Sequence, residues 1–396
     1  MLRKKILAVL VSAAVWTAGA EASGEIPARG AVPLSPPPEL SILSGWTRYS
    51  GEANRNLLGF PADPAKRDRE FSRLAERLRR AVSEDPGTSI PETFRRVLIR
   101  EEGFAYEPAA GNPENYLLDA VLSRKRGNCL GLSLLWLSLA ERLDLPFRGV
   151  YVPGHCFVRF EGDRARVNVE FSDGGAPWED DRFRREFRLA PGRPYLQSLS
   201  PAEMTGVFLK SLGAAYARKE RHADALGIYG EAERLFPLLP DAPYNAGVSL
   251  QRTGRSAEAM EKYRQALSID PDMAAARDNL GILLAKEGRY AEAISEARRA
   301  VELEPENAAA RGNLGSAYCA CGRYEEGVRE FRRAVEIAPR SAPLRAGLVR
   351  AHYARGEYRE AAMQCDAAVA LGCRFEPEML TVLDRYREPA GVSAFP

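Results

Sequence analysis

The sequence has few histidines and almost no net charge. Its 396 residues include three histidines, and 56 lysines and arginines are balanced by 54 aspartates and glutamates, which leaves a formal net charge of +2. Non-specific binding to nucleic acid requires many unopposed cations that displace the counterions of the phosphates. The composition therefore argues against a nucleic-acid partner, and we expect none.

Apolar runs long enough to span a membrane are also missing. The run from Ile6 to Ala20 has 15 residues, fewer than the ~20 that a membrane-spanning helix needs. It follows a basic start and ends in two overlapping A-x-A patterns, which is typical of a secretory signal. We expect a signal peptide over 1–22 and an exported protein, periplasmic or extracellular in a bacterium. No integral membrane segment would remain after cleavage, and an uncleaved anchor is the alternative.

The six cysteines lack the spacing of a metal site or a disulfide framework. Two of them, Cys129 and Cys156, lie in the first half, and the other four are Cys319, Cys321, Cys365 and Cys373. The single residue inside Cys319-x-Cys321 differs from the paired spacing of a zinc site. We expect no metal and no cofactor, and leave open a disulfide among the last four cysteines.

The second half of the sequence repeats with a period of 34 residues. The residues in phase are Pro237, Pro271, Pro305 and Pro339, then Gly213, Gly247, Gly281 and Gly315, then Ala225, Ala259, Ala293, Gly327 and Ala361. This period, with small residues where two helices cross and Pro after the second helix, resembles the tetratricopeptide repeat (TPR). The resemblance implies about five repeats in an all-α solenoid over 204–372. Residues 373–396 would supply a terminal capping helix.

Three asparagines occupy one position of successive repeats. Asn245, Asn279 and Asn313 fall on the first helix of each repeat, the helix that lines the concave groove in proteins of this kind. They are our predicted ligand-binding residues, because a ladder of amides can hold an extended peptide or a chain terminus. Hydrogen bonding between neighbouring repeats, or simple consensus, is the alternative. The expected partner is a protein or peptide.

Composition also divides the residues that precede the repeats. Residues 24–40 are rich in Pro and small side chains, and we predict a Pro-rich tether over 23–62. A compact domain is expected over 63–200. Its first helices are predicted from Asp63 to Arg80 and from Pro91 to Glu102, where apolar residues recur at helical spacing and Pro and Gly mark the ends.

A third predicted helix begins at Cys129 and runs to about Leu143, directly after Gly127 and Asn128. A cysteine at a helix N-terminus feels the positive end of the helix dipole, which lowers the pKa of its thiol and favours the nucleophilic thiolate. The basic run 124–126 adds positive charge nearby, although such a run is more often a solvated turn.

Two strands are predicted next, from Val150 to Phe160 and from Ala165 to Phe171, with Gly162–Asp163 as a two-residue hairpin turn. This turn pairs Glu161 with Arg164 and places His155 directly opposite Glu170. Directly opposed residues have their Cβ atoms about 5 Å apart on one face of the sheet. The hairpin therefore predicts a contact between an imidazole and a carboxylate.

These residues supply the groups that a thiol enzyme needs, a nucleophile, a base and a group that orients the base. His155 is the only histidine in the first 200 residues. We predict Cys129 as nucleophile, His155 as base and Glu170 as orienting acid, with Asn168 as an alternative orienting group.

Cys156 alternates to the face of its strand opposite His155, so we expect it in the core. A redox pair of Cys129 and Cys156 is disfavoured, because the C-x-x-C spacing is missing and the two residues are expected in different layers.

The order of cysteine, histidine and acid resembles the transglutaminase-like cysteine-enzyme superfamily. The segments LLDAVLSRKRGNCLGLSLL, GVYVPGHCFVRF and NVEFSDGG are similar to its bacterial SirB-type branch. The resemblance covers roughly 65–175 and implies a papain-related α+β fold with Cys129, His155 and Glu170 in the catalytic roles. The superfamily usually has Asp where this chain has Glu170, and many members of this branch lack the cysteine.

We therefore expect an exported, thiol-dependent acyl-transfer enzyme, either an amide or peptide hydrolase or a transglutaminase-like enzyme. Its repeats would recruit a protein or peptide. The alternative is a non-catalytic adaptor or scaffold, in which the transglutaminase-like domain is a binding module and the repeats carry the function.

Overall fold

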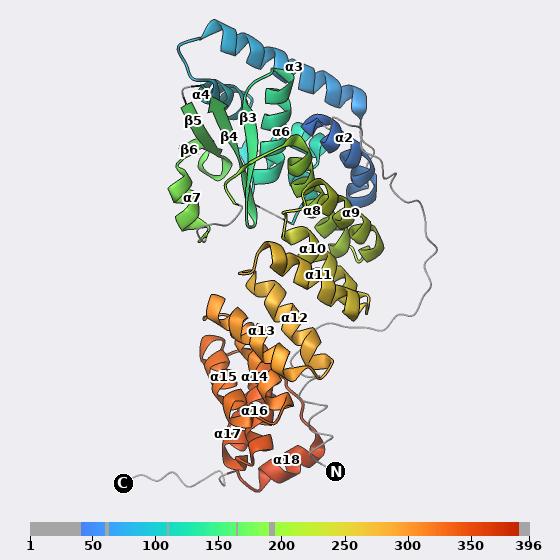
Figure 1. The fold of residues 1–396 in the computed structure, drawn as a ribbon, viewed down its shortest axis with the longest axis vertical. Helices are drawn as coiled ribbons and strands as arrows, with labels where there is room; N and C mark the ends of the chain where they lie inside the picture. The colour runs from blue at the N-terminus through green and yellow to red at the C-terminus, as the bar shows by residue number, and fades with distance from the viewer. Residues whose placement is uncertain (1–40, 60–62, 109–110, 164, 190–194, 388–396) are drawn as a thin grey trace. The chain divides into compact units, whose positions relative to one another are not determined.

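The computed structural model describes residues 41–387 except 60–62, 109–110, 164 and 190–194. The predicted signal peptide and residues 24–40 lie outside these residues. The chain divides into two compact units, whose described residues fall within 41–259 and 260–387. The first unit combines helices and strands and the second is entirely helical in its described part, so an α+β domain is followed by a helical solenoid (Figure 1).

A five-stranded sheet forms the centre of the first unit, in the order β6-β5-β4-β3-β7 with every neighbouring pair antiparallel. Its strands are β3 (Phe147–Val152), β4 (His155–Gly162), β5 (Ala165–Glu170), β6 (Ala176–Trp178) and β7 (Ser198–Leu199). A parallel pair of short strands, β1 (Ala105–Tyr106) and β2 (Arg126–Gly127), lies just before α6 in sequence.

The helix α6 (Cys129–Arg142) packs against β3 and β4 and is almost entirely buried (Figure 1). Trp136 in the middle of α6 is 1% exposed and meets the rings of Phe94, Phe147 and Phe171. The other helices of this layer are α3 (Pro64–Glu84), α4 (Ile90–Phe94), η2 (Arg95–Glu101) and α5 (Leu118–Arg124). The predicted first two helices and the helix that begins at Cys129 are therefore present.

A second, smaller core covers the opposite face of the sheet under α7 (Asp180–Glu186). It joins Val150, Val152 and Phe157 to Phe183 of α7. The rings of Phe157 and Phe183 stack with their centroids 3.8 Å apart. Residues 155, 157 and 159 of β4 point to this face by strand alternation, and 156, 158 and 160 point to α6.

The predicted tether over 23–62 is wrong over residues 41–59. These residues form α2 (Ile42–Ala53) and η1 (Asn54–Leu58), and Trp46 is 1% exposed. The Trp46 Nε1–H donates to the carbonyl of Tyr116 at 2.7 Å. Ile42, Ala53 and Leu57 are buried with it, so this segment contributes to the core because its apolar residues recur at helical spacing.

The predicted single strand from Val150 to Phe160 is also wrong, because a two-residue turn divides it. Val152 pairs with His155, and Gly154 between them has φ +74°. Pro153 followed by a glycine with positive φ is typical of a type II turn, where Pro fixes the first central residue and Gly accepts the second. His155 is consequently the first residue of β4.

The register of the next hairpin differs from the prediction by two residues. Glu161 pairs with Arg166 instead of Arg164, and Gly162 pairs with Ala165. Gly162 is a residue of the strand and lies against the ring of Phe160, so that a Cβ there would be 2.5 Å from that ring. A shift of two residues keeps every side chain on its predicted face, so His155 and Glu170 become diagonal neighbours.

Helical pairs follow from residue 201 onward. They are α8 (Pro201–Arg218), α9 (His222–Leu235), α10 (Asp241–Arg252), α11 (Ser256–Ile269), α12 (Ala274–Lys286), α13 (Tyr290–Leu303), α14 (Ala308–Ala320), α15 (Tyr324–Ile337), α16 (Ala342–Arg355) and α17 (Tyr358–Ala370). α8 and α9 share the main core of the first unit through Phe208 and Tyr229. α18 (Pro377–Asp384) covers the last pair with Met379 and Leu383. Among the described residues, the length and apolarity that a bilayer-spanning helix needs do not occur together in one helix.

One repeat has a glycine where the others have alanine, and the structure shows why. A Cβ at Gly327 on α15 would lie 2.3 Å from the Cys319 sulfur of α14. One period earlier the corresponding residues are Ala293 and Ala285. The larger cysteine side chain therefore occupies the space that a methyl group fills in the preceding repeat.

Replacing Gly327 with alanine should lower the free energy of unfolding by about 1–3 kcal/mol, because the added methyl overpacks the crossing of α14 and α15. In a Cys319→Ala background the same change should cost less by about 1 kcal/mol or more, because the sulfur is gone and only the Gly315 carbonyl oxygen, 3.1 Å from the added Cβ, still opposes it. Urea titration followed by circular dichroism measures both values. Equal effects in the two backgrounds would show that Cys319 does not set the glycine requirement.

Candidate active site

The predicted nucleophile Cys129 is the first residue of α6 and is partly exposed. Asn128 caps the helix, its side chain accepting from the Gly131 N–H at 3.0 Å. A Cβ at Gly131 would lie 2.1 Å from the carbonyl oxygen of Asn115. Only glycine allows this close approach, so the first turn of α6 and the cysteine on it have a fixed position.

His155 follows the Pro153–Gly154 turn and meets Glu170 of β5, as predicted. Its Nε2 lies 2.7 Å from the Glu170 Oε2. The side chains of His155 and Glu170 are 10% and 1% exposed. The imidazole stacks on the ring of Phe187 with centroids 5.0 Å apart. One ring nitrogen and one ring face are therefore fixed by the protein.

The second oxygen of Glu170 is also occupied. Its Oε1 accepts from the backbone N–H of Ser172 at 2.8 Å and from the Ser172 hydroxyl at 2.6 Å. A carboxylate with both oxygens hydrogen-bonded cannot rotate away from its partners without losing several bonds. Ser172 was not foreseen, and its position two residues after a strand-end acid is the only sequence signal for it.

Asn168, the alternative orienting group, does not contact His155. Its Oδ1 accepts from the Arg159 Nε at 2.7 Å, and its Nδ2 donates to the Trp178 carbonyl and to Asp180, each at 2.8 Å. Arg159 is fully buried and also donates to Asp180 at 2.6 Å. Asn168 therefore satisfies a buried arginine, a role that sequence reasoning missed.

The charges of the site favour a thiolate beside an imidazolium. The pKa of the Cys129 thiol lies well below its usual value, first because the Cys156 side chain hydrogen-bonds to it and then because His155 contributes a hydrogen bond and positive charge, which together outweigh burial. Burial opposes charging of His155, but the hydrogen bonds and charges of Cys129 and Glu170 outweigh it and raise the pKa of the imidazole to about 9. Burial also disfavours the Glu170 carboxylate, yet His155 and Ser172 hold the pKa of Glu170 below its usual value.

The expectation that Cys129 and Cys156 occupy different layers is wrong. Cys156 points toward α6, with its sulfur 4.0 Å from the Ser133 hydroxyl on the first turns of that helix. A side-chain hydrogen bond with Cys129, burial and the charge of Cys129 raise the pKa of the Cys156 thiol well above its usual value. His155 and Cys156, which both lower the pKa of Cys129, are consecutive residues of β4.

The basic run before Cys129 is engaged by carboxylates rather than directed at the thiol. Arg124 pairs with Glu107 at 2.9 Å and Glu114 at 3.2 Å, and Lys125 pairs with Glu102 at 3.1 Å. Glu102 is 3% exposed and binds Arg73 at 2.7 Å, and it also pairs with Arg77. Lys125 has φ +52°, so this cluster holds the turn that leads to β2 and α6.

The predicted ligand-binding asparagines lie on α10, α12 and α14 and are half-buried. Asn313 donates from its Nδ2 to both carboxylate oxygens of Asp278 at 3.0 Å. Asp278 belongs to the preceding repeat, so this contact joins neighbouring repeats. The role of Asn245, Asn279 and Asn313 as peptide ligands remains a prediction.

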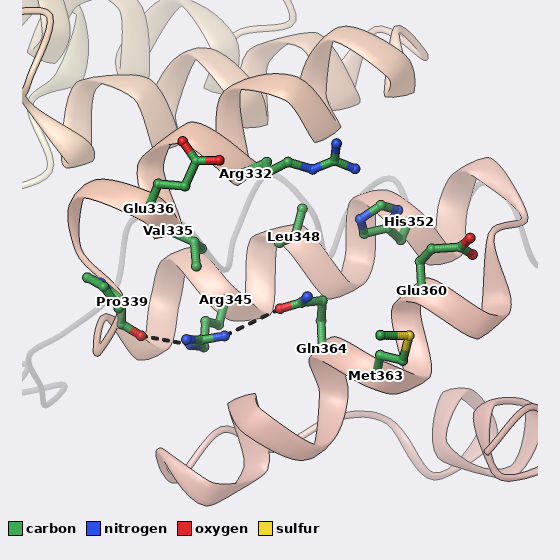
Figure 2. A pocket seen from close by; sticks show the side chains of 10 residues that line it. All are labelled: Arg332, Val335, Glu336, Pro339, Arg345, Leu348, His352, Glu360, Met363 and Gln364. Carbon is green, nitrogen blue, oxygen red and sulfur yellow. Dashed lines mark hydrogen bonds between the residues drawn. The ribbon is translucent and has the colours of Figure 1, made fainter. Parts of the chain in front are cut away.

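A row of arginine–glutamate ion pairs also runs along the repeats, and in the last repeat a glutamine takes the place of the glutamate. Arg277 pairs with Glu296 at 2.6 Å and Arg311 with Glu330 at 2.9 Å. The corresponding Arg345 donates to the neutral side chain of Gln364 at 3.3 Å and to the carbonyl of Pro339 at 2.8 Å. Figure 2 shows Arg345, Gln364 and Pro339 at the wall of a pocket that α15, α16 and α17 line.

The described residues contain no group of three or more His, Cys, Asp or Glu side chains placed to hold a metal ion. A thiol whose pKa is lowered by a histidine, with an acid that orients this histidine, is an arrangement suited to nucleophilic chemistry.

Comparison with family models agrees with this architecture. Residues 66–209 match the model described as the transglutaminase-like superfamily. Residues 211–274 and 279–343 match the tetratricopeptide repeat model. The chain therefore carries a transglutaminase-like domain followed by tetratricopeptide repeats, a combination that indicates a role in protein interaction.

Similar curated proteins come from two bacteria. The chain is 30% identical over 141 residues to a UPF0162 protein of Xylella fastidiosa (strain Temecula1), covering 33% of this chain and 49% of that protein. It is 35% identical over 99 residues to the UPF0162 protein PA3419 of Pseudomonas aeruginosa, covering 24% and 36%. The chain spans about half the length, or less, of these relatives.

Similar solved structures include MamA 41-end from Desulfovibrio magneticus RS-1, with 22% identity, a TM-score of 0.40 and coverage of 42% of this chain and 94% of that chain. Pseudomonas aeruginosa pilF has 22% identity and a TM-score of 0.42, covering 47% and 86%.

Replacing Glu102 with glutamine should lower the free energy of unfolding at pH 7 by about 2 kcal/mol, after allowance for its partly exposed arginine partners. Hydrogen bonds from Arg73 outweigh burial and, with Lys125 and Arg77, lower the pKa of Glu102 from 4.5 to about 2. A lowered pKa stabilises the fold above the unfolded value and loses this effect as the pH falls toward the folded one. The difference between wild type and variant in urea titrations should therefore shrink from pH 5 to pH 2.

The matched control is Glu76→Gln on α3, an exposed partner of Arg79 and Arg80. This change should leave the unfolding midpoint nearly unchanged. An effect as large as that of Glu102→Gln would mean that general surface charge, and not the buried cluster, determines stability.

Proposed function

We propose that this chain, which joins a transglutaminase-like domain to tetratricopeptide repeats, is an exported enzyme that transfers acyl groups from an amide through the Cys129 thiol. The observation that carries the proposal is the contact of 2.7 Å between His155 and the buried Glu170 carboxylate, to which the charges of the site correspond. A thiol with a lowered pKa adjoins an imidazole whose pKa is raised to about 9, and a buried carboxylate holds that imidazole at 2.7 Å. A structural cysteine would not need these partners.

In this mechanism the Cys129 thiolate attacks the amide carbonyl, and a tetrahedral intermediate forms. The His155 imidazolium then gives its proton to the leaving amine, which produces a thioester and a neutral imidazole. Water or a second amine attacks the thioester, and His155 takes the proton of this nucleophile as the thiolate leaves. Glu170 keeps the imidazole oriented and stabilises its charged form.

The oxyanion of the intermediate needs a hydrogen-bond donor that is already in place. We expect the backbone N–H of Cys129 to serve, because the first N–H groups of a helix lack acceptors within the helix. Hydrolysis is the simpler outcome, and transfer to an amine is the transglutaminase-like outcome. The repeats would bring a protein or peptide to the enzyme.

A second candidate is a non-catalytic adaptor. The low exposure of His155, whose side chain is 10% accessible, favours it, because a base must reach its substrate. In that case the transglutaminase-like domain is a stable binding module and the repeats supply the interaction. The two candidates differ in whether Cys129 forms a covalent intermediate.

Iodoacetamide should alkylate Cys129 rapidly well below pH 8.5, the usual pKa of a cysteine thiol. In His155→Ala the rate at pH 6 should fall about tenfold or more, because the thiolate loses an ionic partner, while the Cys156 hydrogen bond preserves part of the effect. Peptide mass spectrometry gives the rate at each pH. Cys321, an exposed cysteine in the repeats, is the internal control and should not respond to His155→Ala. Alkylation that begins only above pH 8 in the wild type would favour the adaptor.

Hydrolysis of an activated ester such as p-nitrophenyl acetate should show a burst of acyl-enzyme, which Cys129→Ala abolishes. Glu170→Gln should reduce turnover by about 10²–10⁴, because the imidazole loses its orienting charge. A labelled primary amine in the assay distinguishes transfer from hydrolysis. Turnover that survives Cys129→Ala would exclude the proposed nucleophile.

A further inference from the structure

The two cysteines of the first unit meet at the start of α6. Cys129 begins this helix, and Ser133 lies four residues later on the same helix face. The Cys156 sulfur of β4 is 4.0 Å from the Ser133 hydroxyl. Cys129 and Cys156 are each among the causes of the other's shift in pKa. Both thiols therefore lie at the first turns of α6, although their positions are 27 apart in the sequence.

Their environments differ in a way that gives each a separate role. Cys129 is partly exposed, so a small reagent can reach it. Cys156 is 2% exposed, and in the described structure it faces the first turns of α6. A reagent from solution reacts first with Cys129. The buried Cys156 thiol can then react only with the modified Cys129 side chain.

We propose that Cys129 and Cys156 form a reversible disulfide, with Cys129 as the reactive thiol and Cys156 as the resolving thiol. The site would thus accept a small disulfide as an oxidant in addition to an acyl substrate. The proposal depends only on the two thiols, and it goes beyond acyl transfer because it does not require that reaction.

The chemistry balances with an external disulfide as the two-electron oxidant. The Cys129 thiolate attacks one sulfur of the oxidant, whose other sulfur leaves as a thiolate, and a mixed disulfide forms. Cys156 loses its proton and attacks the Cys129 sulfur, and the second half of the oxidant leaves as a thiolate. Two protein thiols have been oxidised, and one disulfide has been reduced to two thiols.

Deprotonation of Cys156 is the demanding step, because a side-chain hydrogen bond with Cys129 and burial raise the pKa of its thiol and the charge of Cys129 raises it further. The mixed disulfide removes the negative charge of Cys129 and so removes one of these causes. The buried thiol becomes a better nucleophile after its neighbour has been modified, which favours the intramolecular step over attack on a second oxidant.

Such a bond would block Cys129 toward acyl substrates and protect it from irreversible oxidation to a sulfinic acid. Reduction by a dithiol would restore the thiol. The state of this bond would then determine whether the chain is available for acyl transfer or acts through its repeats alone.

The test is to incubate the full chain with oxidised glutathione, quench it in acid, and digest it with trypsin without reduction. Cleavage after arginine places Cys129 on the peptide 127–142 and Cys156 on the peptide 149–159. We expect a cross-linked species whose mass is that of both peptides less two hydrogens, and its loss on treatment with dithiothreitol. Alkylation of Cys129 by iodoacetamide should fall about tenfold or more after oxidation and recover after reduction.

In Cys156→Ser the reaction should stop at the mixed disulfide, so the peptide 127–142 carries glutathione. Cys156→Ala should give the same result, and circular dichroism verifies that both variants fold. The matched control Cys321→Ser removes an exposed cysteine of the repeats and should leave the cross-link intact. Glutathione retained on Cys129 in the wild type, or a cross-link to a cysteine of the repeats, would overturn the proposal.

These outcomes are independent of those of the proposed function. A cross-link in a chain that has no acyl-transfer activity would support the thiol pair and reject the enzyme. Acyl transfer that is unchanged by oxidised glutathione, with no cross-link, would support the enzyme and reject the thiol pair.

Discussion

A buried carboxylate is stable only when its oxygens are hydrogen-bonded, and the arrangement of the site depends on how Glu170 satisfies this requirement. One oxygen meets His155 at 2.7 Å and the other meets Ser172 through two bonds. The imidazole is held from one edge by Glu170 and from one face by Phe187. The other edge of the ring is the one that the proposed mechanism assigns to Cys129, so the carboxylate would determine which ring nitrogen exchanges a proton with the thiol.

The same constraint explains a glutamate at this position. His155 and Glu170 are diagonal neighbours, because Gly162 pairs with Ala165. Diagonal pairs on adjacent strands have their Cα atoms about 7–8 Å apart, farther than the roughly 5 Å of directly opposed ones, and long side chains are needed to bridge them. The additional methylene of glutamate supplies reach that aspartate lacks. The longer side chain of Glu170 therefore compensates for its diagonal position relative to His155. Whether Asp or Glu suits this position depends on the register of the two strands.

The sequence was sufficient for the helix that begins at Cys129, for the His155–Glu170 contact and for the 34-residue repeat, because each follows from local periodicity or from a nearby turn. The register of the β4–β5 hairpin was not predictable, because no local sequence pattern shows that Gly162 belongs to the strand and packs against the ring of Phe160. The contact was predicted correctly only because a two-residue shift preserves the faces of a strand. The Pro153–Gly154 turn and the helical spacing of the apolar residues around Trp46 are present in the sequence, but they were not used in the prediction. The proximity of Cys156 to Cys129 requires knowing how α6 crosses β4, which is tertiary information.

The repeats show how substitutions at equivalent positions can give one repeat a different surface. Arg277 and Arg311 are neutralised by glutamates, whereas the equivalent Arg345 meets the neutral Gln364. Nearby, the stacking of Arg323 on Tyr318 at 4.7 Å gives way one period later to a hydrogen bond of His352 with Glu357 at 2.7 Å. In a solenoid each repeat contacts only its neighbours, so changes of this kind alter local charge without disturbing the stacking of the others. The last repeat can therefore present different chemistry to a partner while it keeps the helix packing that the 34-residue period requires.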